Sequence, residues 1–332
     1  MTVPDSAPDG SRVLGAALPA SALVAAALVA VNWAGLFATG RLDEVTGGVA
    51  VSALSGWLLS TASFVPFLAA VLLVVVAPSR RTVAGGVAVV YVADLLLVVV
   101  RSVLSPLPVR SWLPVLAVPL TRVAAVLAVA TAAWIAYHGG YDRVASALGN
   151  PDQHPLFAVV AGDRIGPDLT VRRGAAAAGL GAVVAAGGAV VAGLLGDLLA
   201  AVARAGATGS ESIFFTRGQF WNVGIPLSQL PAEWLFEASF LLGVLFVIGP
   251  RLRPRDLTKG VAVVLVVQST AQLLPALLPP VRPVSLWSPT GPVLGPLVDA
   301  VVLAGVATAV WLAVHGGAEA VRSLVSADST IP

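Results

Sequence analysis

A twelve-residue stretch that occurs twice constrains the fold of this chain more than any other sequence feature. Residues 129–140 read VATAAWIAYHGG and residues 306–317 read VATAVWLAVHGG, so nine of twelve positions are identical at a spacing of 177. This identity is too high for chance, even in a chain rich in alanine and valine. The same spacing joins further pairs: Phe37 and Phe214, Thr39 and Thr216, Gly47 and Gly224, and Trp57 and Trp234. The sequence therefore predicts an internal duplication.

Long apolar runs set the class of protein. Hydrophobic residues make up 58% of the 332 residues and charged residues only 11%, against roughly 25% charged in a soluble domain. A helix needs about 20 apolar residues to cross a bilayer. Eight such runs are present: about 14–37, 53–77, 82–104, 113–138, 174–202, 232–248, 257–278 and 293–315. We expect an all-α integral membrane protein with eight transmembrane helices in two tandem, parallel four-helix repeats.

The repeats divide the chain into four parts. Residues 1–148 form the first repeat, residues 149–172 a polar connector on the cytoplasmic side, residues 173–325 the second repeat, and residues 326–332 a C-terminal tail. Because each repeat has an even number of helices, both copies enter the membrane in the same direction. They are then related by an axis near the membrane normal.

The distribution of lysine and arginine predicts the orientation. Twelve of these residues fall on the side that holds both termini and the connector, and five fall in loops on the other side. Cytoplasmic loops carry the excess of positive charge. We therefore expect a multi-pass protein of the cell membrane with both termini in the cytoplasm.

Ionisable residues inside the apolar runs are the strongest candidates for function. A charge near the bilayer centre costs at least about 2.5 kcal/mol, so it faces a partner or a water-filled cavity. Asp94 and Arg101 lie seven residues apart on one face of the third run, and Arg122 lies in the fourth run. The residue that matches Arg122 at a spacing of 177 is Asp299. We expect these two opposite charges to meet near the axis between the repeats.

Two glutamines extend this candidate site. Gln268 stands where the first repeat has Asp94, at a spacing of 174, and Gln272 lies one turn further along the same run. Three interpretations of the Arg122–Asp299 pair stay open. It forms a salt bridge that only fixes how the repeats dock, it forms a gate or solute site at their interface, or its members reach toward the outer surface. The substrate or gate candidates are Asp94, Arg101, Arg122, Gln268, Gln272 and Asp299.

Glu237 and Asp197 add acidic groups to the outer half of the predicted bundle. A polar vestibule that opens outward would explain them, and so would proximity to the membrane surface. The apolar loop 213–230, interrupted by glycine and proline, is expected to cover the outer interface rather than to form a pore loop.

A row of small residues predicts close helix packing in the fifth run. Its members recur every fourth position: Ala177, Gly181, Ala185, Ala189 and Gly193. Small residues let a second helix approach closely where lipid removes the hydrophobic drive for association. We expect a central packing helix, with a substrate path along the groove as the alternative.

The matched histidines His138 and His315 close the fourth and eighth runs, each directly before Gly-Gly. A histidine in a last helical turn complements the helix dipole, and the following glycine ends the helix. Ligation of a metal or haem is the alternative. No further histidine or acidic cluster completes such a site, so we expect no cofactor and no metal.

No sequence pattern predicts catalysis. The chain has no cysteine, which excludes disulfides and thiolate sites. It also lacks the HExxH, GxSxG, P-loop and paired-aspartate motifs. We therefore expect no enzyme activity.

The expected partners are the lipid bilayer and a small solute or ion. Nucleic acid is not expected, since no basic run is interleaved with aromatic residues, and protein partners stay undefined. Two functions follow: a transporter or permease-like protein with a polar site at the repeat interface, or a non-catalytic membrane scaffold or accessory subunit of a membrane complex.

Overall fold

The computed structural model describes residues 10–38, 40, 48–104, 113–147, 164–165, 169–208, 231, 234–249, 252–277 and 291–328. The described fold is helical apart from one antiparallel hairpin of β1 (Arg164–Ile165) and β2 (Leu169–Thr170). The first half holds α1 (Gly10–Ala38), α2 (Val49–Val76), α3 (Arg80–Leu104), the 3-10 turn η2 (Pro114–Ala117), α4 (Leu120–Tyr137) and α5 (Gly140–Ala147). The second half holds α7 (Val171–Thr208), the Trp234–Val247 helix, α9 (Pro254–Leu277), α10 (Gly291–Val314) and α11 (Gly317–Asp328).

Six of the described helical segments are long and apolar enough to cross a membrane. They are Ser11–Phe37, Val51–Val76, Arg80–Val100, Pro114–Tyr137, Val171–Ala203 and Leu294–Val314. This confirms the all-α class and supports the expected multi-pass membrane architecture. Two of the eight expected spans are not among the six. They correspond to the shorter Trp234–Val247 helix and to α9.

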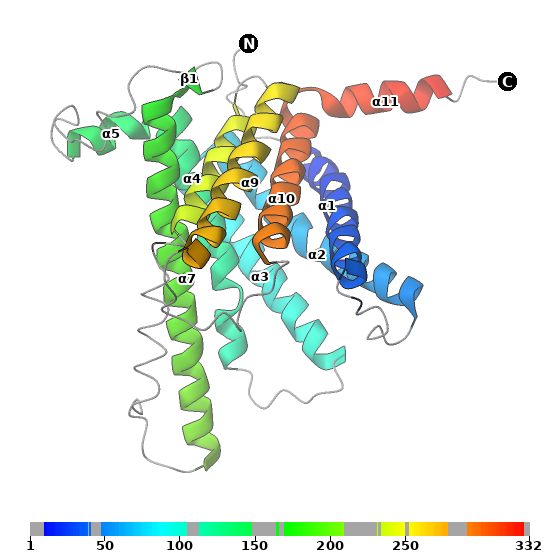
Figure 1. The fold of residues 1–332 in the computed structure, drawn as a ribbon, viewed down its shortest axis with the longest axis vertical. Helices are drawn as coiled ribbons and strands as arrows, with labels where there is room; N and C mark the ends of the chain where they lie inside the picture. Colours follow the sequence, from blue (N-terminus) through cyan, green and yellow to red (C-terminus); the bar gives the residue numbers. More distant parts are fainter. Residues whose placement is uncertain are drawn as a thin grey trace.

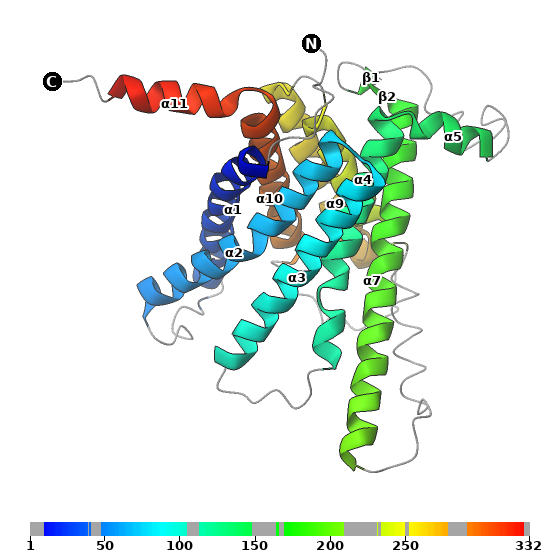
Figure 2. The ribbon, with the colours of Figure 1, turned by 180° about the vertical axis from the view of Figure 1, so that it is seen from behind.

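The long helices form one bundle, and two helices leave it sideways (Figure 1). Helices α5 and α11 extend from the same end of the bundle, the end at which α1 begins (Figure 1). With 38 residues α7 is the longest of the described helices, and its C-terminal part extends beyond the other labelled helices at the opposite end (Figure 2). Large apolar side chains on one face of α3 are exposed, as expected of a lipid-facing surface: Val89, Val92, Leu96 and Val100.

The two halves contact each other through their first and last long helices. Helix α4 of the first half packs along α7 of the second, and α10 of the second half packs along α1 of the first. Both contacts are close. A Cβ atom at Gly188 of α7 would collide with Ala124 of α4, and one at Gly305 of α10 would collide with Val24 of α1. Glycine is therefore needed at both crossings.

Only the first three members of the row of small residues on α7 pack as predicted. Ala177, Gly181 and Ala185 are buried against α4 and its neighbours, whereas Ala189 and Gly193 are exposed. Contact continues instead through Gly188, which faces Ala124. The cause is the helical period of 3.6 residues, because a strict four-residue row drifts around the helix and leaves the interface.

The duplicated stretch forms the same turn in both halves. After α4, Gly139 has φ +75°, and a Cβ at Gly140 would lie 2.5 Å from the Trp134 ring. After α10, Gly316 has φ +75°, and a Cβ at Gly317 would lie 2.5 Å from the Trp311 ring. The first glycine takes the left-handed conformation and the second leaves room for the indole. Each turn redirects the chain from a bundle helix into α5 or α11, two helices that the sequence patterns do not predict.

Candidate functional site

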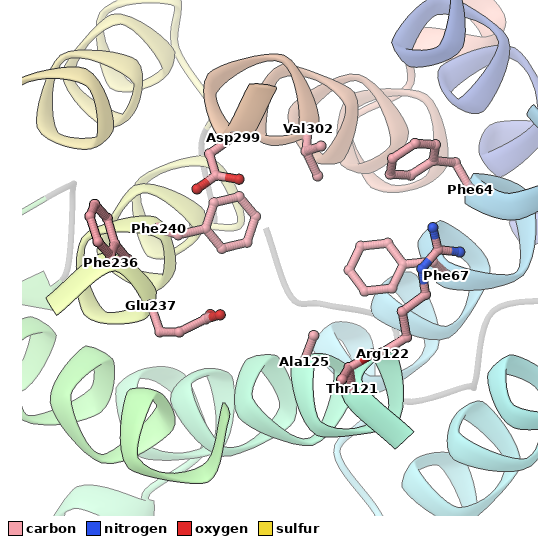
Figure 3. A pocket seen from close by; sticks show the side chains of 10 residues that line it. All are labelled: Phe64, Phe67, Thr121, Arg122, Ala125, Phe236, Glu237, Phe240, Asp299 and Val302. Carbon is pink, nitrogen blue, oxygen red and sulfur yellow. The ribbon is translucent and has the colours of Figure 1, made fainter. Parts of the chain in front are cut away.

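A partly open cavity of about 240 Å³ lies between helices of the bundle (Figure 3). Side chains from α2, α4, the Trp234–Val247 helix and α10 line it, so both halves contribute. The lining residues are Phe64, Phe67, Thr121, Arg122, Ala125, Phe236, Glu237, Phe240, Asp299 and Val302. The cavity is thus a partly charged space within a mainly apolar bundle.

Several lining residues occupy matched positions in the two halves. Arg122 matches Asp299, and Ala125 matches Val302, both at a spacing of 177. Phe64 and Phe240 end two copies of the tripeptide Ala-Ser-Phe at a spacing of 176. Both halves of the chain therefore contribute residues at sequence spacings of 176 or 177 to the cavity wall.

Arg122 bonds within its own half. Its Nη1 lies 3.0 Å from Oδ1 of Asp94 on α3 and donates to the Ser63 carbonyl of α2 at 2.8 Å. Its guanidinium carbon lies 5.4 Å from the centre of the Phe64 ring. The Asp94 side chain is only 10% exposed. The expected ion pair between Arg122 and Asp299 is therefore not formed, because Arg122 has a partner on the neighbouring helix.

Asp299 also bonds within its own half. The Gln268 side chain of α9 donates to Oδ2 of Asp299 at 2.8 Å and to the Phe236 carbonyl at 3.3 Å. Gln268 is fully buried at 1% exposure. Each half thus contains a polar pair between its third and fourth long helices, and each pair reaches a carbonyl of the second. The positions are the same, although an acid–base pair in one half is replaced by an amide–acid pair in the other.

The charged groups are divided between the two sides of the cavity. In Figure 3 the carboxylates of Asp299 and Glu237 lie on one side, and the guanidinium of Arg122 lies on the other. Phe236 and Phe240 belong to the acidic side, whereas Phe64 and Phe67 surround Arg122 (Figure 3). Because Asp94 is bonded to Arg122, the basic side is neutralised by its own helix pair.

The six predicted site residues have different positions relative to the cavity. Arg122 and Asp299 line it, and Asp94 and Gln268 bond to them from behind. Gln272 is half-buried and faces α10, where its Nε2 would lie 3.1 Å from a Cβ at Gly295. Arg101 lies in the last turn of α3, and its side chain is outside the described part of the chain. The structure thus brings four of the six together.

Sequence reasoning missed most of the cavity wall. It noted Glu237 as an acidic residue but not as a neighbour of Asp299, and it did not select the four phenylalanines. The repeated Ala-Ser-Phe tripeptide was the available signal for Phe64 and Phe240. Asp197 is exposed on α7, away from the cavity lining, and the loop 213–230 lies outside the described residues.

The two histidines lie at matching helix ends but have different surroundings. Nε2 of His138 lies 3.2 Å from the Val75 carbonyl near the end of α2. The equivalent Nε2 of His315 is buried and has no hydrogen-bond partner among the described residues. Burial lowers the pKa of His315 below its ordinary value, and the nearby backbone of Gly249 opposes that shift. The described residues contain no group of three or more His, Cys, Asp or Glu side chains suited to a metal.

Comparison with known proteins returned no relative. No protein-family model, no curated protein and no solved structure matches the chain. The functional interpretation therefore depends on the helices, the cavity and the side chains that surround it.

Proposed function

We propose that this chain is a membrane transport protein that binds a small solute in the cavity between its two halves. One observation carries the proposal: a cavity of about 240 Å³ lined by Arg122, Glu237 and Asp299 lies inside a bundle of apolar helices. Charged groups at such depth are costly and are kept where they face a water-filled path or a ligand. In transporters built from repeats, the binding site lies between the repeats.

In this proposal the chain is a tandem duplication whose halves are related by a twofold axis. Three sets of contacts support it. The indole nitrogens of Trp57 and Trp234 donate to Ala22 and Gly179, each at 2.9 Å, so α1 and α7 correspond at an offset of 157. The crossing of Gly305 with Val24 corresponds, at the same offset, to the crossing of Ala128 with Gly181. The polar pairs behind the cavity are the third set.

The proposed protein crosses the cell membrane eight times. The Trp234–Val247 helix and α9 join the six longer apolar helices, and both termini lie in the cytoplasm, where most lysine and arginine residues then fall. The proposal includes no enzymatic step, cofactor or nucleic acid. Its ligand is a small solute or ion.

A scaffold or accessory subunit is the second candidate. The pairs Arg122–Asp94 and Gln268–Asp299 favour it, because buried polar bonds also hold helices together without any ligand. The two candidates differ in whether water reaches the cavity. A transporter must admit water and solute, whereas a scaffold keeps the bundle interior closed.

Single cysteines test this difference directly, since the chain has none of its own. We would make Ala125→Cys and Val302→Cys, two matched and partly exposed positions of the cavity wall. Membrane-impermeant thiol reagents, one cationic and one anionic, are then added to intact cells and to inverted vesicles. Transport predicts that both variants react with at least one reagent from at least one side.

Three control positions define the outcomes. Ala132→Cys, at a site only 1% exposed, should stay unreactive, and Ser52→Cys and Ser146→Cys, both at exposed sites, should react. If the exposed controls react and neither cavity variant does so from either side, the cavity is closed to water. That result would overturn the transport proposal in favour of a scaffold.

A further inference from the structure

We propose that Asp299 binds and releases a proton in the cavity, so that a proton is the coupling ion of the transport proposed above. The proton comes from water in the cavity and returns to water when the cavity faces the other side of the membrane. This inference rests on the proposed solute site and names its coupling ion. It depends on the partner of Asp299, on the orientation of Gln268 and on the opening of the cavity.

Each half holds one aspartate between its third and fourth long helices, but the partners differ. Asp94 is 3.0 Å from the guanidinium of Arg122, so a full positive charge balances its carboxylate. Asp299, in the apolar segment of α10, accepts a hydrogen bond at 2.8 Å from Gln268, its bonding partner among the described residues. A neutral amide satisfies a lone pair but adds no charge. In an apolar bundle, a proton stabilises such an aspartate because it removes the charge that the surroundings solvate poorly.

The bonding of Gln268 leaves one oxygen of Asp299 for the proton. Both N–H groups of the Gln268 amide are used, one by Oδ2 of Asp299 at 2.8 Å and one by the Phe236 carbonyl at 3.3 Å. Gln268 is only 1% exposed, so its amide is held in this orientation. Oδ2 accepts the bond in both forms of the carboxyl group, and the proton therefore binds at Oδ1. The pair stays intact while the proton enters and leaves.

The cavity gives water access to Asp299. This half-buried residue lines the partly open cavity, whereas Asp94 is buried behind Arg122. Because an ionised Asp299 requires water beside it, the cavity closes around the protonated form. Movement of the cavity from one side of the membrane to the other then carries a proton. Glu237 also lines the cavity but has a further interaction of its own, so only Asp299 is assigned a proton.

Few charged groups of the described residues face Asp299 from the helices around it. Those of the cavity lining are Arg122 on α4 and Glu237 on the Trp234–Val247 helix. Arg122 lies across the cavity and has its own partner on α3 (Figure 3). Helix α2 contains no charged residue, and the α9 residue that bonds Asp299 is a neutral glutamine. The charged residues of α1, α9 and α11 lie toward the end of the bundle from which α11 extends: Arg12, Arg255, Asp256, Lys259, Glu319, Arg322 and Asp328.

Infrared spectroscopy of the protein in lipid vesicles tests the proton directly, because a carboxylic acid and a carboxylate absorb at different frequencies. The spectrum of Asp299→Asn is subtracted from that of the unchanged protein at about pH 5.5, where an exposed aspartate is already ionised, and at about pH 9. The difference should show a carboxylic acid band at the lower pH and a carboxylate band at the higher pH. Asp197→Asn, at an exposed acid on α7, should show a carboxylate band at both. A carboxylate from Asp299 at both pH values, or an acid at both, would overturn the proposal.

A carbodiimide provides a second measurement, on the unchanged protein, in case Asp299→Asn does not fold. Dicyclohexylcarbodiimide is apolar and adds to protonated carboxyl groups within membranes. Mass spectrometry of peptides should find it on Asp299 and not on Asp94, and the modification should fall at least about tenfold between the two pH values. Gln268→Arg gives Asp299 the kind of partner that Asp94 has, and it should abolish the modification. Equal modification of both aspartates, or modification of neither, would contradict a proton on Asp299.

Failure of proton coupling and failure of the solute site give different results. Ala125→Cys and Val302→Cys report whether water and solute reach the cavity. If both cysteines react while Asp299 stays ionised, the solute site stands without proton coupling. If neither cysteine reacts from either side, the solute site is refuted whatever the charge of Asp299.

Discussion

At the scale of single residues, the polar pairs behind the cavity show how a buried charge is kept in an apolar bundle. The first half uses Asp94 with Arg122, and the second half uses Gln268 with Asp299 at the same positions. In the first pair the donor lies on the fourth long helix, and in the second pair it lies on the third. Each buried polar group has a hydrogen-bond partner within its own half, as buried polar groups generally require.

We predict that the pair of one half can be transplanted into the other. Asp94→Gln alone leaves Arg122 without its counter-charge, and Arg122→Asp alone places two carboxylates together. Each should cost roughly 1.5–3 kcal/mol, the usual range for a hydrogen bond to a charged group. The double variant recreates the Gln–Asp pair and should be more stable than either single variant. Thermal unfolding in detergent, analysed as a double-mutant cycle, measures this coupling.

The matched control for this cycle combines Asp94→Gln with Asp197→Asn, because Asp197 is exposed and does not contact the pair. Those two changes should be additive. If the losses of Asp94→Gln and Arg122→Asp are also additive, the two positions do not form an exchangeable pair.

Sequence alone identified these polar residues within apolar runs but not their partners. The spacing of 177 relates Arg122 to Asp299, and both residues line one cavity. The expected direct contact between Arg122 and Asp299 was wrong, because the partner of a buried charge depends on which helices are neighbours. Arg122 reaches Asp94 on α3, a residue close in sequence, before it could reach across the cavity. The four phenylalanines of the cavity wall are uncharged, so the sequence does not distinguish them from other apolar residues of a transmembrane helix.

At the scale of elements, the contact between α4 and α7 depends on where glycine replaces a larger side chain. Gly187 and Gly188 are neighbours on α7 with different surroundings. A Cβ at Gly187 would meet nothing within 4 Å, whereas one at Gly188 would collide with Ala124. The methyl group of Ala124 has no rotamer by which it can move away, so the helices themselves would have to separate.

We therefore predict opposite effects for two adjacent substitutions. Gly188→Ala should destabilise the protein by roughly 1–3 kcal/mol, the usual cost of overpacking a close contact. Gly187→Ala should be neutral or slightly stabilising, because alanine is the better helix former. Thermal unfolding of both variants in the same detergent is the measurement. Equal stability of the two variants would show that α4 and α7 are not packed as closely as described.

The small residues of α7 also show what a periodic pattern can and cannot predict. The pattern correctly indicated a packing helix, and Ala177, Gly181 and Ala185 are buried. It did not predict the shift to Gly188, because the path of a partner helix depends on its crossing angle. For Trp134, His138 and the following glycines the sequence predicts only a helix end. Its role in directing the chain into α5 depends on the Trp134–Gly140 contact, which the sequence does not show.

At the scale of the whole molecule, each of the eight apolar runs of the sequence contains a helix in the described part of the structure. The Trp234–Val247 helix is one of two, with α9, on which the relation of the bundle to the membrane depends. Its fourteen residues extend for about 21 Å at 1.5 Å per residue, which is shorter than a hydrocarbon core of about 30 Å. It crosses only if adjoining residues extend it or the bilayer thins around it. The number of crossings in the second half, and hence the position of α11, depends on this helix and on α9.

The lateral helices α5 and α11 provide a test of the full topology. If α7, the Trp234–Val247 helix, α9 and α10 all cross, four crossings separate α5 from α11, and both lie at the cytoplasmic surface. We predict that Ser146→Cys on α5 and Ser323→Cys on α11 react with an impermeant thiol reagent only in inverted vesicles. Ser52→Cys, near the start of α2 and one crossing away from the cytoplasmic end of that helix, should react in intact cells. If Ser146→Cys and Ser323→Cys react from opposite sides, the second half crosses an odd number of times. The two halves could then not be parallel repeats around a shared cavity.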